Sequence, residues 1–253
     1  MQREGVNKLN EELLKKLQKI KPEVTNEVTN SGTVLTLSGS VQKTPWYADE
    51  DEVFINIETV EKYLGNVEGD ITIRLNSGGG DVFEGIEVYN YIKGLENHVT
   101  IEVTALAASA ASIIAMGADE IKMHTGSSMM VHEASTIAWG NKSDIQKTLN
   151  ALETIDDSIV SIYAERTGAD VEEINNWITE ETWFTADEAV EVGLADSKHE
   201  KKVDNVINIT PETVAEIVAN EMKKYTAQLT PTPIVTPEPK VTGLNKLFKK
   251  KGE

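Results

Sequence analysis

Residues 71–85, ITIRLNSGGGDVFEG, decide the fold. Residues 71–75 predict a strand and residues 82–95 predict a helix, joined by the segment Asn76 to Asp81. The three glycines of this segment let the backbone turn sharply and leave N–H groups uncovered. Such N–H groups at a helix N-terminus can hold developing negative charge. A phosphate-binding P-loop is excluded because no Gly-Lys-Ser/Thr follows; a tight turn without function is the simpler interpretation.

A second strand-to-helix junction, ALAASAAS at residues 105–112, crowds small residues around Ser109. A nucleophilic serine needs this setting, because an acyl group must reach its hydroxyl and neighbouring N–H groups must face the oxyanion. An alanine-rich buried helix with incidental serines is the alternative. A serine also needs a base. His132 suits that role because it ends the apolar run Met129–Val131, so that a strand delivers it to an edge.

The other three histidines have less distinctive surroundings. His98 lies in a polar turn and is expected at the surface, and His124 follows the strand-like EIKM and is expected to be structural. His199 lies among charged residues. A single histidine at a strand end is more often structural than catalytic, so a structural role for His132 stays open at this point.

Strands and helices alternate through the middle of the chain, which favours βαβ units with right-handed crossovers and an α/β fold. The predicted strands lie at residues 53–57, 71–75, 99–104, 121–123 and 129–131, and the predicted helices at 58–64, 82–95 and 143–166.

The chain divides into four segments. Residues 1–31 are a polar N-terminal extension with a short predicted helix at 8–19. Residues 32–208 form the α/β domain, and a C-terminal helix follows at 209–228. The proline-rich linker and lysine-rich end of residues 229–253 predict a disordered tail. A docking peptide for an acidic partner is the alternative for this tail.

Composition excludes several classes of function. The 253 residues carry a formal net charge of −18, which argues against nonspecific nucleic-acid binding. Cysteine is absent, so disulfides, thiolate zinc sites and cysteine nucleophiles are excluded. The longest nearly apolar run, residues 105–116, is too short to cross a membrane, and the N-terminus lacks the apolar core of a signal peptide. These patterns predict a soluble, cytoplasmic protein with neither nucleic acid nor membrane as its partner.

Four segments, in this order, resemble the Clp-type serine peptidases: NSGGGDVFEG, ALAASAASIIAMGA, SSMMVHEA and ETWFTADEAVEVGLAD. The resemblance covers about residues 53–196. It implies the ClpP/crotonase-like fold, a spiral of repeated βαβ units with a protruding handle helix, here formed by residues 136–142 and the long helix after them. The Trp-Phe-Thr-Ala sequence and the extra terminal segments are most similar to the phage and prophage branch of head-maturation (prohead) proteases.

The resemblance also assigns roles to residues. It implies Ser109 as the nucleophile and His132 as the general base of a serine endopeptidase. The third member of the triad, usually aspartate in the family, falls on Glu181, with Glu180 as its nearest rival. Thr185 and Glu188 predict a capping box for the helix that starts at Ala186 and holds the preceding turn in place.

The remaining implied site residues surround the nucleophile. The N–H groups of Gly80 and Ala110 fall on the oxyanion hole, and Gly79 and Asp81 on the substrate-binding segment. Neither a cofactor nor a metal ion is implied. Two departures from the housekeeping enzymes are Gly78, where they have proline, and Glu133-Ala134, where they have Gln-Pro.

The resemblance implies polypeptide substrates and a homo-oligomeric ring, a heptamer or a double ring. For the phage branch the substrates would be capsid, portal or scaffold proteins, and the location an assembling procapsid. A Clp-like proteolytic subunit working with a separate AAA+ unfoldase is an alternative, since this chain has no Walker motif. Trp139 is expected either at an inter-subunit contact or over the local core.

Three further readings stay open. A crotonase-like acyl-CoA enzyme would need no serine nucleophile, so Ser109 and His132 argue against it. A Ser–Lys peptidase would need a catalytic lysine, and the sequence offers no candidate. A degenerate subunit with only a structural role in a ring or capsid is the third, and the exchange of aspartate for Glu181 keeps it open.

Overall fold

The computed structural model describes residues 20–29, 32–49 and 51–199, which belong to one compact unit, residues 1–201. The helix predicted at 8–19, the C-terminal helix predicted at 209–228 and the tail at 229–253 lie outside the described residues. Within the described part, no helix is both long and apolar enough to cross a membrane.

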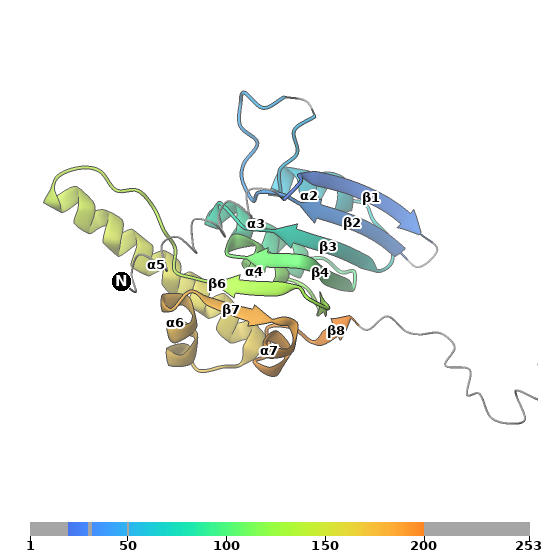
Figure 1. Ribbon diagram of the computed structural model, residues 1–253. Coiled ribbons are helices and arrows are strands. Elements are labelled where there is room, and N and C mark those ends of the chain that lie inside the picture. Colours follow the sequence, from blue (N-terminus) through green and yellow to red (C-terminus); the bar gives the residue numbers. More distant parts are fainter. Residues whose placement is uncertain (1–19, 30–31, 50, 200–253) are drawn as a thin grey trace, which may run out of the picture. The chain divides into compact units, whose positions relative to one another are not determined.

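An eight-stranded mixed sheet forms the centre of this unit (Figure 1). Its main path runs β1-β2-β3-β4-β5-β8, while β6 pairs with β4 and with β7. The β1–β2 and β6–β7 pairs are antiparallel, and all the other pairs are parallel. The strands are β1 (Glu23–Thr29), β2 (Gly32–Ser38), β3 (Ile71–Ser77), β4 (Val99–Ala108), β5 (Glu120–His124), β6 (Ser128–Val131), β7 (Thr182–Thr185) and β8 (Ser197–His199).

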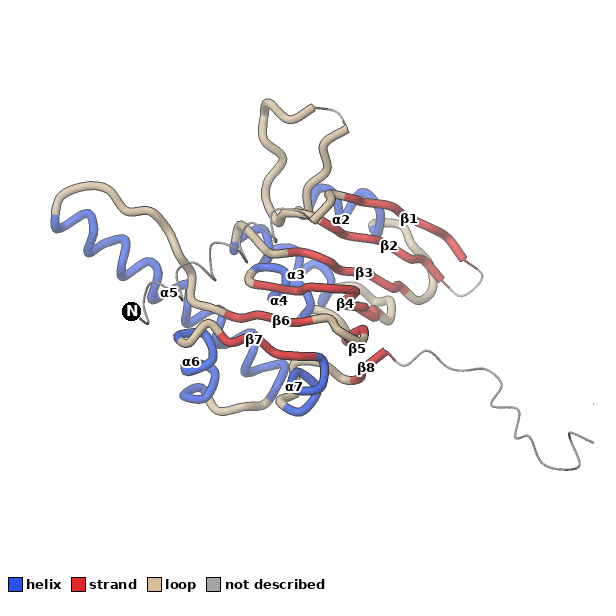
Figure 2. The backbone as a smooth tube through the Cα atoms, viewed as in Figure 1, coloured by secondary structure: helices blue, strands red, loops and turns tan. Residues whose placement is uncertain are grey.

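Six helices accompany the sheet in the described residues, and Figure 2 shows α2, α3 and α4 along one side of it. The first half of α5 projects beyond the sheet, whereas its second half buries Ile159, Ile162 and Tyr163. At about 1.5 Å per residue, its 26 residues span about 39 Å. The helices are α2 (Ile57–Leu64), α3 (Val82–Lys93), α4 (Ala110–Ala115), α5 (Lys142–Thr167), α6 (Val171–Thr179) and α7 (Ala186–Glu191).

Alternation along the central strands separates an apolar face from a more polar one. On β3 and β4 the odd-numbered residues Ile73, Leu75, Ile101 and Val103 are fully buried in the core. Even-numbered residues such as Glu102 lie on the opposite face and are only partly buried. The sheet therefore presents a second, wetter surface on which polar side chains can meet.

An irregularity in the β3–β4 pairing lets β4 serve two neighbours. Leu75 pairs with Val103, but the next pair is Ser77 with Ala107, so β4 carries two additional residues at this point. Before it, β4 pairs with β5, and after it, with β6. Bulges often re-aim a strand end beside a functional site, and here the second half of β4 leads directly to Ser109.

Most predicted elements are confirmed, and the α/β fold with them, but the strand predicted at residues 53–57 is wrong. Only Ile55 makes a bridge there, to Val41. The next residue, Asn56, is buried and accepts a hydrogen bond from the Thr59 N–H at 2.9 Å, so the helix begins at once and leaves no length for a strand. The sheet also reaches into the predicted N-terminal extension, because β1, which lies within residues 1–31, pairs with β2.

Candidate active site

Ser109 occupies a strained turn between β4 and α4. Its backbone has φ 55° and ψ −128°, a conformation that costs a non-glycine residue roughly 1–3 kcal/mol. The Ser109 N–H donates to the Met130 carbonyl at 2.9 Å, which anchors the turn to β6. Such strain persists only where the surroundings hold it and clusters at functional sites. Among the described residues, the only other non-glycine residue with positive φ is Glu181.

His132 lies against Ser109, with Nε2 2.8 Å from the serine Oγ. The parallel pairing of β4 with β6, in which Ala108 faces Met130, brings the two strand ends side by side. With its proton on Nδ1, the neutral imidazole accepts the hydrogen bond from the hydroxyl through Nε2. This arrangement is what a general base needs to take the proton of a serine.

The glycine segment packs directly behind Ser109. Gly79 has φ +87°, and a Cβ on it would lie 2.5 Å from the Ala108 oxygen and 2.7 Å from the Ser109 Cβ. Gly80 has φ +150°, and a Cβ there would lie 2.1 Å from the Val41 oxygen. Both positions exclude a side chain. Gly79 thereby allows the two strand-to-helix junctions to touch, and Gly80 allows the first junction to lie close to Val41.

Two backbone N–H groups near Ser109, those of Gly80 and Ala110, are free of backbone hydrogen bonds in the described part of the chain. Asp81, predicted in the substrate-binding segment, caps α3 by accepting from the Phe83 N–H at 2.8 Å, and it lines the cavity. Gly79 is buried next to Ser109. The two uncommitted N–H groups are of the kind that stabilise an oxyanion.

A buried hydroxyl network, not predicted from the sequence, holds Ser109 from below. Ser112 Oγ lies 2.6 Å from the Ser109 carbonyl oxygen, 3.1 Å from the Met130 carbonyl oxygen and 2.8 Å from the Tyr163 hydroxyl. Burial raises the pKa of Tyr163 above its ordinary value, so its hydroxyl stays neutral. Ser112 follows Ser109 at helical spacing, a detectable signal, whereas Tyr163 comes from α5 and gives none.

Two carboxylates lie near the histidine. β7 pairs antiparallel with β6, with Thr182 opposite Val131, so Glu181 falls beside His132 along the ladder. The Glu181 side chain is exposed, and no hydrogen bond joins it to His132 in the described part of the chain. Asp156 of α5 accepts from the Ala134 N–H at 2.7 Å. Burial raises the pKa of Asp156, and the hydrogen bond from the Ala134 N–H opposes that shift.

A cavity of about 390 Å³ opens beside the two catalytic candidates. Ser109, Ala110 and His132 form one part of its wall, and Phe83, 65% exposed, stands at its edge. Another part of the wall is mostly apolar and comes from α5, through Ala151, Leu152, Ile155, Ile159 and Tyr163. A pocket of this kind suits an apolar side chain next to a reacting carbonyl.

The other histidines differ from His132 in their surroundings. His98 is exposed, as predicted, and its Nδ1 lies 3.6 Å from Asp119. His124 and His199 face Glu102 on the polar side of the sheet. Trp139, in the loop before α5, is 98% exposed, so its side chain does not cover the local core. The predicted capping box of α7 is confirmed, with Thr185 and Glu188 in reciprocal hydrogen bonds.

Comparison with known proteins finds a match to the Clp protease family over residues 59–202. An ATP-dependent Clp protease proteolytic subunit of Bacteroides fragilis is 30% identical over 144 residues, which cover 55% of this chain and 70% of the relative. The ATP-dependent Clp protease proteolytic subunit 3 of Rhodococcus jostii is 32% identical over 148 residues, covering 58% and 71% respectively. The matched region contains the whole candidate site.

Proposed function

Because this chain belongs to the Clp protease family, we propose that it is a serine endopeptidase with Ser109 as nucleophile and His132 as general base. The observation that carries the proposal is the 2.8 Å contact between Ser109 Oγ and His132 Nε2. The strained backbone of Ser109 and Gly79 packed against it support the same assignment.

The proposed reaction is acyl transfer in two halves. His132 takes the Ser109 proton as the hydroxyl oxygen attacks a peptide carbonyl carbon, and the N–H groups of Gly80 and Ala110 stabilise the oxyanion. The imidazolium then gives its proton to the leaving amine, which departs with the C-terminal part of the substrate. Water, deprotonated by the same histidine, attacks the acyl-enzyme and releases Ser109.

Glu181 is proposed as the third member that orients the imidazole. Its place opposite the end of β6 and its positive φ of 51° support this role, because strained backbone conformations cluster at functional sites. The side chain would need to turn toward Nδ1 when substrate binds, since catalytic hydrogen bonds often tighten only in the substrate complex. Asp156, which accepts a hydrogen bond from the Ala134 N–H two residues after His132, is a rival carboxylate beside Glu180.

The proposed substrates are polypeptides, and in the phage branch these are capsid, portal or scaffold proteins. A ring assembly, with or without a separate AAA+ unfoldase, belongs to the same proposal. Ile137 and Trp139 in the loop before α5 are 97% and 98% exposed, and an assembly would give these apolar side chains a surface to pack against.

A fluorophosphonate probe tests the nucleophile. Intact-mass analysis of the full chain is expected to show one adduct, which is absent in Ser109→Ala and slowed by about 10³-fold or more in His132→Ala. Ser135→Ala is the matched control, because Ser135 lines the same cavity. An adduct that persists in Ser109→Ala refutes the assignment. A folded wild-type chain without any adduct supports the structural-subunit alternative.

The same probe ranks the carboxylates. Glu181→Gln is expected to slow labelling more than Asp156→Asn or Glu180→Gln, because only a carboxylate that orients the imidazole affects proton transfer directly. If Asp156→Asn gives the largest loss with an unchanged circular dichroism spectrum, Asp156 takes the place of Glu181.

A further inference from the structure

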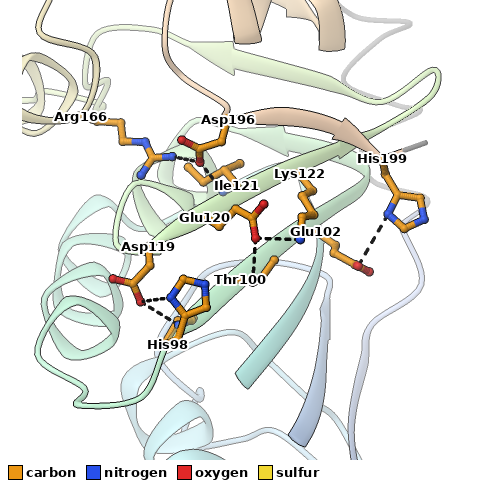
Figure 3. A network of polar contacts seen from close by, with 11 residues as sticks. His98, Thr100, Glu102, Asp119, Glu120, Ile121, Lys122, Arg166, Asp196 and His199 are labelled. Carbon is orange, nitrogen blue, oxygen red and sulfur yellow. Dashed lines mark hydrogen bonds and ion pairs between the residues drawn. The ribbon is translucent and has the colours of Figure 1, made fainter. Parts of the chain in front are cut away.

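Three potential metal ligands converge on the polar face of the sheet, away from Ser109. Glu102 lies on β4, His124 on β5 and His199 on β8, three strands that are neighbours in the sheet. The parallel register places His124 beside His199 and Glu102 beside Lys122, so all three ligand residues emerge on the same face. Figure 3 shows Glu102 and His199 facing each other across this part of the sheet.

The ligand atoms are close enough to share one ion. One atom from each residue lies within 4.8 Å of the others. His124 Nε2 is 3.6 Å from Glu102 Oε2, and His199 Nδ1 is 3.8 Å from Glu102 Oε1. Both distances are too long for hydrogen bonds. His124 Nε2 is also one of the few buried polar side-chain atoms in the described residues that have no hydrogen-bond partner. A buried nitrogen in this state indicates a missing partner.

We propose that Glu102, His124 and His199 bind a divalent transition metal ion of the zinc class. Two imidazoles and one carboxylate are the ligand set of many zinc sites with one open coordination position. Hard ions such as Mg²⁺ and Ca²⁺ prefer all-oxygen shells, so the two nitrogens select against them. The fourth position is left to water, because no further ligand residue joins the group in the described chain.

Neighbouring charges set the conditions for binding. Arg74 Nε lies 3.5 Å from Glu102 Oε2 and competes for that oxygen, which leaves Oε1 as the natural metal ligand. Lys122 Nζ lies 2.7 Å from Glu120 Oε2 and forms an ion pair with that carboxylate. The rings of His124 and His199 stack 4.2 Å apart at 13°, and parallel rings cannot point both nitrogens at one ion. One ring, the outer His199, therefore turns when the metal binds.

The structural consequence concerns β8. This strand has three residues and pairs only with β5, at the edge of the sheet. Such a short edge strand has little pairing energy of its own. A metal ion bridging β4, β5 and β8 would fix its last residue, His199, to the centre of the sheet. The site would thus hold the end of the peptidase unit in place, without taking part in the chemistry at Ser109.

Zinc and cobalt alone, added to the metal-free full chain, test the proposal. Isothermal titration is expected to show one Zn²⁺ per chain, and Co²⁺ to give the visible absorption of a four-coordinate site. Loss of an outer-shell partner of a metal ligand usually weakens metal affinity by about 10–100-fold. His124→Ala removes a ligand itself, so it is expected to weaken Zn²⁺ binding by more than that. Hydrogen exchange of residues 197–199 is expected to slow when Zn²⁺ is added to the wild type and to stay unchanged in His124→Ala.

His98→Ala is the matched control, because His98 also lies 3.6 Å from a carboxylate, Asp119, but has no second histidine beside it. It should bind zinc as the wild type does. Glu102→Gln retains the size of the side chain and should lose cobalt absorption while circular dichroism stays unchanged. Absence of zinc binding to the folded wild type overturns the proposal. So does binding of equal strength in His124→Ala, which would place the ion elsewhere, for example at His132.

Discussion

The two halves of β4 form opposite kinds of site. The first half pairs with β5 and presents Glu102 to His124 on a polar face, at distances that leave room for an ion. The second half pairs with β6 and ends at Ser109, whose hydroxyl touches His132 at 2.8 Å. On the same outer face, the second half carries Leu106 and Ala108 in a small apolar cluster with Met130.

The difference indicates that the packing and hydrogen bonding around a histidine decide which role it suits. His132 follows three buried apolar residues of β6, and its partner Ser109 has a strained backbone against which Gly79 packs closely. His124 is the last residue of β5, a strand in which charged and apolar residues alternate, and its Nε2 has no hydrogen-bond partner among the described residues. A histidine held in a fixed position suits proton transfer. A group of side chains that can still move suits a metal ion, because the ion imposes its own coordination geometry on them.

Gly79→Ala should break the second half and spare the first. The new Cβ would meet the Ala108 oxygen at 2.5 Å and would need φ +87°, so Ser109 must move. A displacement of about 1 Å at a catalytic group costs about 10²-fold, and probe labelling should fall at least that far. Gly69→Ala is the control, since its φ of +81° is similar but no atom lies within 4 Å. Equal labelling rates in the two variants would contradict the close packing behind Ser109.

Tyr163→Phe should weaken the support of Ser109 without removing it. Ser112 keeps its contacts with the Ser109 and Met130 carbonyls but loses the one with the Tyr163 hydroxyl. The free energy of unfolding should fall by about 1 kcal/mol, with a smaller loss of labelling rate than in Gly79→Ala. Tyr89→Phe is the control, because that hydroxyl bonds Lys93 and Glu165 instead. Unchanged labelling in Tyr163→Phe would make the network structural only.

Glu188→Gln should give the smallest effect, on stability at acid pH. Hydrogen bonds from the Thr185 N–H and hydroxyl hold the pKa of Glu188 below its ordinary value of 4.5. Its carboxylate therefore stabilises the folded chain above pH 4.5, and this contribution is lost as the pH falls through the lowered pKa. Urea unfolding from pH 7 to 3 should show a shallower acid decline in Glu188→Gln. Glu191→Gln on the same helix should follow the wild type, and an unchanged decline in Glu188→Gln would contradict the capping box.

The central fold could be predicted because its signals are local. Glycines 78–80, the apolar spacing of the strands and the Thr185–Glu188 capping box each act within a few residues. The prediction of a strand at 53–57 failed because a single capping residue, Asn56, starts a helix there. The β-propensity of the neighbouring residues gives no information about such a cap. β1 was missed because its side chains are mostly exposed, so its sequence lacks an apolar pattern.

The candidate site was predictable where chemistry depends on residue type, and less so where it depends on distant packing. Ser109 and His132 are recognisable from their small and apolar neighbours. Tyr163 lies 51 residues from its partner Ser112, and no sequence period links them. The Glu102, His124 and His199 group is scattered over three strands, so only the register of the sheet brings it together. The assignment of Glu181 stays a prediction.

The irregular pairing between β3 and β4 also limits how this segment can evolve. From Leu75 to Ser77 β3 advances two residues, and from Val103 to Ala107 β4 advances four. Both steps are even, so inward and outward positions stay in phase and all four residues remain buried. Inserting or deleting one residue would turn every following side chain to the other face. The segment before Ser109 therefore tolerates insertions or deletions only of an even number of residues.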